Sequence, residues 1–523
     1  MRLGKTRRCW FHYESFVELS LCALLLTSAI ANAHDRSLVW IHDGKWSKQS
    51  IELLHSMSTA QVYGLRPEDY LPPQLLQALS ATPNPDDLSS QASLDAELSA
   101  AATRFITDLH YGRIDPRRAG FDLGRTRTDL DADAALAEIG RSPDVTVALE
   151  AIEPHFYHYQ LLKDALLRYR WLESTHEISH LPPFTGHAPK LGDRYGGIGS
   201  LKSTLSALGD LSLEEFQQAS GESIDAVLAA GIKRFQHRHG IAESGQITRA
   251  TFDALSTPIA KRVRQIELSL ERARWLPPFE SPPIIVNIPQ FKLFAFQLTT
   301  DRAANILQIP VIVGKAYPAT RTPVFIGEMK YVVFRPFWNV PRSIAVRELI
   351  PKIVSAPGYL DRNHLEIVRG PSDQSPVVPP THENIDALAS GQLRLRQRPG
   401  VDNSLGLVKF LFPNSHDVYL HGTPMPSLFT QSSRAFSHGC VRVADPVALA
   451  RYVLRNTTGD WTPAHIAAAM SGADSVGITL DKPIPVIIFY STVLATEAGE
   501  VLFFDDVYGH DKKLEALLGW THM

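Results

Sequence analysis

Cysteine is scarce in this chain: among 523 residues there are three, Cys9, Cys22 and Cys440. An excess of one charge is also lacking, because 52 Lys and Arg stand against 55 Asp and Glu, and the formal net charge is −3. A protein that binds nucleic acid needs a basic face to offset phosphate, so we expect no nucleic-acid partner. The composition is otherwise globular, with 44% hydrophobic and 20% charged residues. The length exceeds what one hydrophobic core organises, so we expect several domains.

The N-terminus also lacks a hydrophobic run of membrane-spanning length. LSLCALLLTSAIA, residues 19–31, falls short of the roughly 20 apolar residues that a membrane helix needs. It follows a positively charged start and precedes an Ala-Asn-Ala cleavage site, which predicts an export signal at residues 1–33. An uncleaved membrane anchor is the alternative. Cleavage would remove Cys9 and Cys22, and the lone thiol of Cys440 would then have no partner for an internal disulfide.

The sequence predicts a mostly helical N-terminal half. Apolar residues recur at helical spacing in residues 94–114 and 156–172. Short segments with Pro and Gly separate such runs, as in GLRPEDYLPP. We therefore expect a helical scaffold domain at residues 34–200.

A compact unit at residues 201–258 should follow, with the pattern helix, loop, helix, turn and short helix. Gly240 should end its second helix in a left-handed conformation. Thr248 or Thr251 should cap the last helix. One amphipathic helix at residues 259–277 then closes the helical half of the chain.

The periodicity changes from helical to strand-like after a linker at residues 259–282. Residues 284–298 predict a hairpin, and later runs rich in Val, Ile, Phe and Tyr predict further strands. We expect a mainly β domain at residues 283–493 and a C-terminal tail at 494–523. The stretch 344–404 has no clear strand period, which favours an insertion or lid. The predicted fold class is therefore multidomain α+β.

Two short motifs supply the residue types that a nucleophilic thiol requires. VYLHGT predicts a strand that ends at His421, and SHGCVRV contains Cys440. A catalytic thiol needs a base, a group that orients the base, and donors for the oxyanion of a tetrahedral intermediate. Gly439 permits close approach of the backbone, so its N–H and that of Cys440 are candidates for an oxyanion hole. A histidine cation or Arg442 nearby would lower the pKa of the thiol.

Composition and spacing leave three hypotheses for Cys440. It is a nucleophile activated by a histidine, an inert buried cysteine, or a ligand of a metal ion. A zinc site would draw on a set of His and Cys residues, namely His416, His421, His438 and Cys440. No HExxH motif strengthens the metal hypothesis.

The spacing of the motifs resembles the catalytic signature of the L,D-transpeptidases. His421, fifteen intervening residues and then Ser-His-Gly-Cys-Val-Arg carry this resemblance, and GKAYPATRTPVF (314–325) is similar to the segment before the family's central strands. The order of ERARWLP, FWNVPRSI, the two motifs and DDVYGHD resembles the large Gram-negative members, with a YkuD-type catalytic domain. FQHRHGI, ESGQIT and TFDAL resemble the small three-helix peptidoglycan-binding domain. Ser244-Gly245 stands at that domain's usual Asp-Gly turn, and Thr248 stands at a later glycine.

The resemblance implies a mechanism. Cys440 would attack the L-centre carbonyl of meso-diaminopimelate in a donor tetrapeptide stem, releasing D-alanine and forming a thioester. The side-chain amine of an acceptor's diaminopimelate would resolve the thioester into a 3-3 cross-link. His421 would act as base and then as acid, oriented by the main-chain carbonyl of Gly422.

The resemblance also implies roles for residues around the thiol. Ser437, His438 and Gly439 would shape the pocket, and Arg442 would steer a substrate carboxylate. Trp338 would line the stem-peptide groove, with a core aromatic as the alternative. The stretch 344–404 coincides with the capping subdomain of the large members.

The remaining expectations concern partners and place. The resemblance implies no cofactor, no metal, peptidoglycan tetrapeptide stems as donor and acceptor, and acylation by carbapenems. Periplasmic location is expected, with the inner membrane and cell-wall synthases as candidate partners. Four alternatives remain beside cross-linking: an L,D-carboxypeptidase with water as acceptor, an enzyme that anchors a lipoprotein lysine to the wall, a non-catalytic wall-binding protein, and a zinc peptidase.

Overall fold

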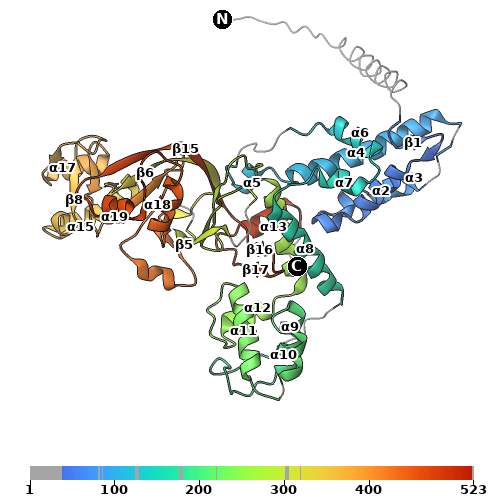
Figure 1. Cartoon of the computed structure of the whole chain (residues 1–523), viewed down its shortest axis with the longest axis horizontal. Helices are drawn as coiled ribbons and strands as arrows, with labels where there is room; N and C mark the ends of the chain where they lie inside the picture. Colours follow the sequence, from blue (N-terminus) through green and yellow to red (C-terminus); the bar gives the residue numbers. More distant parts are fainter. Residues whose placement is uncertain are drawn as a thin grey trace, which may run out of the picture. The chain divides into compact units, whose positions relative to one another are not determined.

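The computed structural model describes residues 38–80, 83–84, 86–123, 129–175, 181–219, 221–300, 305–317 and 320–520. The chain divides into two compact units. Figure 1 colours the whole chain by residue number, from blue at the N-terminus to red at the C-terminus. The first unit holds the residues up to 61 with 65–110 and 129–153, and the second holds 62–64, 111–128 and the residues from 154 onward. The predicted export signal lies outside the described residues. Within those residues, no helix combines the length and the apolar character that crossing a bilayer requires.

The first unit is mainly helical. Its elements are β1 (Ile41–His42), β2 (Lys45–Trp46), α2 (Lys48–Ser58), η2 (Ala60–Tyr63, whose last two residues belong to the second unit), η3 (Pro67–Asp69), α3 (Pro73–Leu79), α4 (Leu88–Tyr111), α6 (Ala132–Arg141) and α7 (Val145–Glu150). Helix α4 confirms the helix predicted at 94–114 and begins earlier. The buried N–H of Trp40 donates to Asp95 on α4 at 2.7 Å, which fixes the β1–β2 hairpin on that helix. Asp131 and Asp144 cap α6 and α7 by accepting backbone N–H bonds.

The second unit begins with a helical segment that confirms several local predictions. Its helices are α5 (Pro116–Ala119), α8 (Tyr157–Thr175), α9 (Ile198–Leu208), α10 (Leu213–Gln218), α11 (Ala226–Arg238), α12 (Arg249–Leu255) and α13 (Ile259–Arg274). Gly240 follows α11 with a φ of 63°, as predicted. The Thr248 hydroxyl caps α12 by accepting the N–H of Thr251 at 3.2 Å. The helix predicted at 259–277 is α13, which ends three residues earlier than expected.

The rest of the second unit is mainly β, as predicted. One sheet contains β3 (Ile284–Asn287), β4 (Lys292–Ala295), β5 (Leu307–Gly314), β6 (Phe325–Phe334), β11 (Val408–Leu411), β12 (Leu420–His421), β13 (Ala435–Ser437), β14 (Val441–Val443) and β15 (Val476–Phe489). The strand order is β13-β5-β14-β12-β11-β6-β15-β3-β4, and β4 also pairs with β5, so the sheet closes on itself like a barrel. The predicted hairpin at 284–298 is the antiparallel pair β3–β4. Helices α18 (Pro446–Leu454) and α19 (Pro463–Ser471) pack on this sheet through Leu449, Val453 and Ile466 (Figure 1).

The stretch 344–404 is more regular than its sequence suggested. It contains η6 (Ala345–Leu349, a π-helical turn), α15 (Ile350–Ser355), α16 (Tyr359–Arg362), β8 (Leu365–Val368), β9 (Val377–Val378), α17 (His382–Ser390) and β10 (Arg394–Gln397), preceded by β7 (Trp338–Asn339) and α14 (Arg342–Ile344). The four strands form a separate sheet in the order β7-β10-β8-β9. The strand period was hidden because each strand is short and because Arg396 is buried in β10, where its Nε donates to Glu366 at 2.6 Å.

The segment expected as a C-terminal tail is folded. It forms the hairpin β16 (Val493–Ala495) and β17 (Val501–Phe503), followed by α20 (His510–Leu517). Val493, Val501 and Phe503 are buried in one hydrophobic cluster with residues of α8, α9, α11 and α13. The last part of the chain therefore completes the core of the helical segment.

Candidate active site

Cys440 lies in the turn between β13 and β14, and its neighbours hold that turn. Gly439 has a φ of 124°, which residues with a Cβ rarely adopt. The buried hydroxyl of Ser437 donates to the Cys440 carbonyl at 2.5 Å and accepts the Gly439 N–H at 3.1 Å. The predicted oxyanion hole is therefore wrong in one part, because the Gly439 N–H is already bonded to this hydroxyl. The Cys440 N–H is the remaining candidate donor.

His421 ends β12 and is 4% exposed. Its Nδ1 lies 2.6 Å from the carbonyl oxygen of Gly422. A carbonyl only accepts hydrogen bonds, so Nδ1 carries the proton and Nε2 of a neutral ring is left as the basic nitrogen. The sequence thus places the orienting carbonyl immediately after the histidine, where the strand turns.

Two cations flank His421 in the sheet. Strand β12 pairs with β11 and β14, and the register sets Lys409 and Arg442 directly opposite His421. Side chains opposite one another in neighbouring strands lie on the same face. Burial, and then the positive charges of Arg442 and Lys409, lower the pKa of His421 to about 3. The imidazole is therefore neutral near pH 7.

The thiol of Cys440 is half-buried and contacts Tyr419 and Asp417. Its Sγ lies 3.7 Å from the Asp417 carbonyl oxygen. Burial raises the pKa of Cys440, while hydrogen bonds from Tyr419 and the charge of Lys409 act in the opposite direction. Because burial is the largest contribution, the thiol is protonated at rest, and it lines the same cavity as the neutral imidazole of His421.

A cavity of about 1400 Å³ opens onto the thiol. Its lining includes seven of the eight predicted site residues: Trp338, His421, Ser437, His438, Gly439, Cys440 and Arg442. The eighth, Gly422, contacts the His421 ring through its carbonyl. The wall opposite Cys440 comes from β7, η6, α17 and β10, so the 344–404 stretch supplies much of the lining. His438 reaches that wall, since its Nε2 lies 2.8 Å from Glu348 on η6.

The metal hypothesis receives no support from the geometry. His416, one of its proposed ligands, pairs through Nε2 with Asp122 at 3.1 Å. In the described parts of the chain, no three His, Cys, Asp or Glu residues are grouped so that they could hold a metal ion.

Three residues at this site were missed by the sequence reasoning. Tyr419 hydrogen-bonds to Cys440 and to the Trp338 indole, and the Lys409 ammonium lies 3.9 Å from the centre of the Tyr419 ring. A signal for Tyr419 existed, because a residue two positions before His421 in a strand lies on the same face. The third is Thr322, which is buried and donates to the Gly439 carbonyl. No local sequence pattern marked Lys409 or Thr322 as site residues. Strand pairing brings Lys409 to the site, and a long-range hydrogen bond to Gly439 brings Thr322.

Comparisons with known proteins identify two domain families in this chain and one similar protein. Residues 31–166 match the Scaffold domain family, and residues 282–472 match the YkuD family, described as the L,D-transpeptidase catalytic domain. A protein of Haemophilus influenzae named "Putative L,D-transpeptidase" is 31% identical over 287 residues, which are 54% of this chain and 56% of that protein. The match thus spans little more than half the length of this curated relative. The chain carries a YkuD-type L,D-transpeptidase catalytic domain behind an N-terminal Scaffold domain.

Proposed function

We propose that the protein forms 3-3 cross-links between peptidoglycan stems through a thioester on Cys440. The observation that carries the proposal is the parallel register of β12 and β14. It sets a neutral, oriented His421 beside the strand that follows Cys440, at the cavity that both residues line. The YkuD match supports the reaction class.

In the first half-reaction, His421 takes the thiol proton while Sγ bonds to the L-centre carbonyl carbon of diaminopimelate in a donor tetrapeptide. The oxyanion that forms would accept the Cys440 N–H. When it collapses, the C–N bond to D-alanine breaks, and the imidazolium returns its proton to the departing amine. Tyr419, whose hydroxyl hydrogen-bonds to the thiol, stabilises the sulfur anion during attack.

In the second half-reaction, the side-chain amine of an acceptor diaminopimelate attacks the thioester carbonyl. His421 removes a proton from that amine, the new amide bond forms, and the C–S bond breaks. The released thiolate is then reprotonated. The products are a 3-3 cross-linked dimer and free enzyme, so one histidine serves both steps.

The charge of the cavity suits a stem peptide, which carries several carboxylates. Seven Lys and Arg residues line the cavity, namely Lys315, Arg321, Arg342, Arg347, Arg394, Lys409 and Arg442, against the two carboxylates of Glu348 and Asp417. Within the described residues, the buried Nε of Arg442 has no hydrogen-bond acceptor. A substrate carboxylate would supply one, which supports the steering role proposed for Arg442.

The proposal also includes the cellular location of the protein and its binding partners. The N-terminal sequence supports export to the periplasm, with cell-wall synthases or the inner membrane as neighbours. The likeness of residues 201–258 to a peptidoglycan-binding domain supports a role for α9–α12 in holding glycan near the active site. The opening of the Cys440 thiol onto the cavity supports acylation by carbapenems, which are strained acyl donors.

Purified protein incubated with tetrapeptide muropeptides tests the proposal. Wild type should release D-alanine and give 3-3 dimers with an acyl-enzyme on Cys440 by mass spectrometry, and Cys440→Ala should give neither. Tripeptide without dimer would instead identify an L,D-carboxypeptidase. Absence of any acyl-enzyme in folded wild type would refute the proposal and favour a wall-binding protein.

A further inference from the structure

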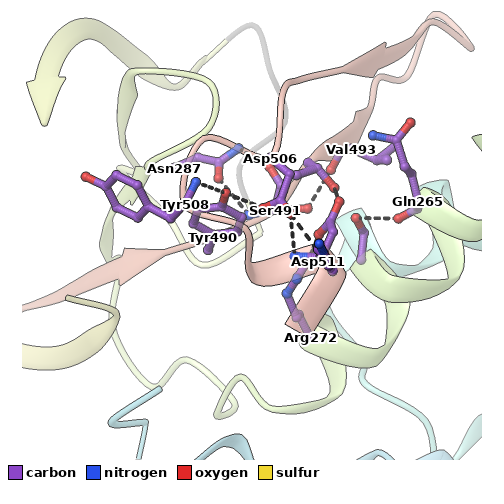
Figure 2. A network of polar contacts seen from close by, with 12 residues as sticks. Gln265, Arg272, Asn287, Tyr490, Ser491, Val493, Asp506, Tyr508 and Asp511 are labelled. Atoms are coloured by element: carbon purple, nitrogen blue, oxygen red, sulfur yellow. Dashed lines mark hydrogen bonds and ion pairs between the residues drawn. The ribbon is translucent and has the colours of Figure 1, made fainter. Parts of the chain in front are cut away.

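The C-terminal segment reaches the catalytic turn through a continuous chain of hydrogen bonds. Its first part is drawn in Figure 2, where Asp511 joins Arg272 of α13, and Tyr490 lies between Asp506 and Tyr508. Arg272 Nη1 donates to Asp511 at 2.5 Å, and the Tyr490 hydroxyl donates to Asp506 at 2.6 Å. The Tyr508 N–H in turn donates to the Tyr490 hydroxyl at 2.9 Å. These contacts fix the backbone that carries the Tyr508 side chain.

The second part of the chain runs from Tyr508 to Gly439. The Tyr508 hydroxyl donates to the carbonyl of Gly314, at the end of β5, at 2.6 Å, and accepts the Thr322 N–H at 3.2 Å. The Thr322 hydroxyl accepts the Gly314 N–H at 2.8 Å and donates to the Gly439 carbonyl at 2.8 Å. Tyr508 and Thr322 are 3% and 1% exposed, so water does not compete for these bonds. Each hydroxyl uses its single proton once, and the directions are mutually consistent.

The loop that carries Thr322 fits against Gly314 with no spare room. A Cβ at Gly314 would lie 2.0 Å from the Thr320 carbonyl oxygen and 2.7 Å from the Thr322 nitrogen. Strand β5 also pairs with the catalytic turn, since Gly314 is in register with Ser437. Thr320, Thr322, β5 and the strand before Cys440 therefore pack tightly against one another.

The Gly439 carbonyl belongs to the same peptide plane as the Cys440 N–H. A trans peptide is planar and points these two groups in opposite directions. A hydrogen bond that fixes the carbonyl on the Thr322 side therefore fixes the direction in which the N–H points. The Gly439 φ of 124° makes this plane the part of the turn that most needs such a restraint, because glycine has the widest conformational freedom.

We infer that Thr322 and Tyr508 are positioning residues for catalysis, which aim the Cys440 N–H at the oxyanion of the acyl-transfer step. Neither side chain touches substrate in this scheme, and Tyr508 acts through Thr322. The inference rests on the proposed function and assigns a role to the 314–325 loop and to the DDVYGHD segment.

Two reagents separate this role from a merely structural one. Meropenem acylates a thiol through a tetrahedral oxyanion, whereas iodoacetamide alkylates a thiol by displacement of iodide and forms no oxyanion. Misaiming the Cys440 N–H should slow the first reaction and leave the second unchanged. Both rates are measured by mass spectrometry of the intact protein.

Thr322→Val removes the hydroxyl and keeps the shape, and Thr322→Ser keeps the hydroxyl. We expect Thr322→Val to slow acylation at least about tenfold, since losing an oxyanion donor outright costs about 100- to 1,000-fold. Alkylation and its pH profile should match wild type, and Thr322→Ser should restore acylation. Thr251→Val, which loses a buried threonine hydroxyl on α12, is the matched control and should acylate normally.

Tyr508→Phe provides a second variant if Thr322→Val does not fold. It should slow acylation several-fold, while Tyr452→Phe, which loses a hydroxyl bonded to the Phe296 carbonyl, should not. Normal acylation in both Thr322→Val and Tyr508→Phe would overturn the inference, as would equal losses in acylation and alkylation. Wild type that is alkylated but never acylated would overturn the proposed function itself, and the inference with it.

Discussion

The depressed pKa of His421 predicts an unusual pH profile for acylation of Cys440. With a pKa of about 3, the imidazole is neutral at pH 7.5 and still neutral at pH 5. The pKa of Cys440 is raised by burial, so the thiol stays protonated over the same range. Because neither group changes its charge, the rate of acylation should change less than about twofold between these two pH values.

A His421 with an ordinary pKa would give a clearly different change in the acylation rate. A histidine with the ordinary pKa of about 6.5 is only about 3% neutral at pH 5, so acylation would fall about 30-fold. The acylation rate falls at low pH because protonating His421 removes the acceptor for the thiol proton. Burial and the two opposing cations, Arg442 and Lys409, push protonation to lower pH.

The assay is the second-order rate of meropenem adduct formation on wild type at pH 5, 6 and 7.5, with circular dichroism to verify folding at each pH. Lys409→Met removes one of the two cations, so any acidic limb should move to higher pH and never to lower. A 30-fold loss at pH 5 in folded wild type would refute the reasoning that burial keeps His421 neutral.

Three further changes have definite expected outcomes. Gly314→Ala would place a Cβ 2.0 Å from a backbone oxygen, so acylation should fall at least tenfold and a thermal melt should show a lower midpoint; a fully active, equally stable variant would contradict this packing. Asp210→Asn breaks the buried pair with Arg238, whose Nε donates at 2.8 Å, and should cost about 3–5 kcal/mol, detected as faster proteolysis within α9–α12. Glu348→Gln replaces the partly exposed carboxylate that lies 2.8 Å from His438 Nε2 and should lower stability by less than about 1 kcal/mol in denaturant titration; a larger loss would show that this contact holds the two segments together.

Local structure was largely predictable from the sequence. Helices α4, α8 and α13 and the β3–β4 hairpin follow from apolar periodicity, and Gly240 and Thr248 end and begin helices as their chemistry dictates. The two motifs that line the cavity were also visible, because each is a contiguous run whose residue types suit thiol chemistry.

Long-range contacts were not predictable in the same way. Thr322 and Gly439 are 117 positions apart, and Tyr508 and Gly314 are 194 apart, and nothing local in either segment specifies its partner. The strands of the 344–404 stretch were not predicted, because the buried Arg396 stands at a position where a strand pattern would have an apolar residue. The hydrogen bond that occupies the Gly439 N–H could not be predicted, because it depends on the rotamer of the Ser437 hydroxyl.

The hairpin β16–β17 and helix α20 influence the order in which the protein folds. The core of α8, α9, α11 and α13 is closed by residues from this hairpin, and the buried Arg272 finds its carboxylate partner, Asp511, 239 positions later. Contacts at such separation form slowly, since loop closure must precede the gain from contact. This core therefore cannot close until the final segment of the chain has joined it. A chain cut just after the catalytic motifs would keep Cys440 and His421, but it would lack the packing that holds them in place.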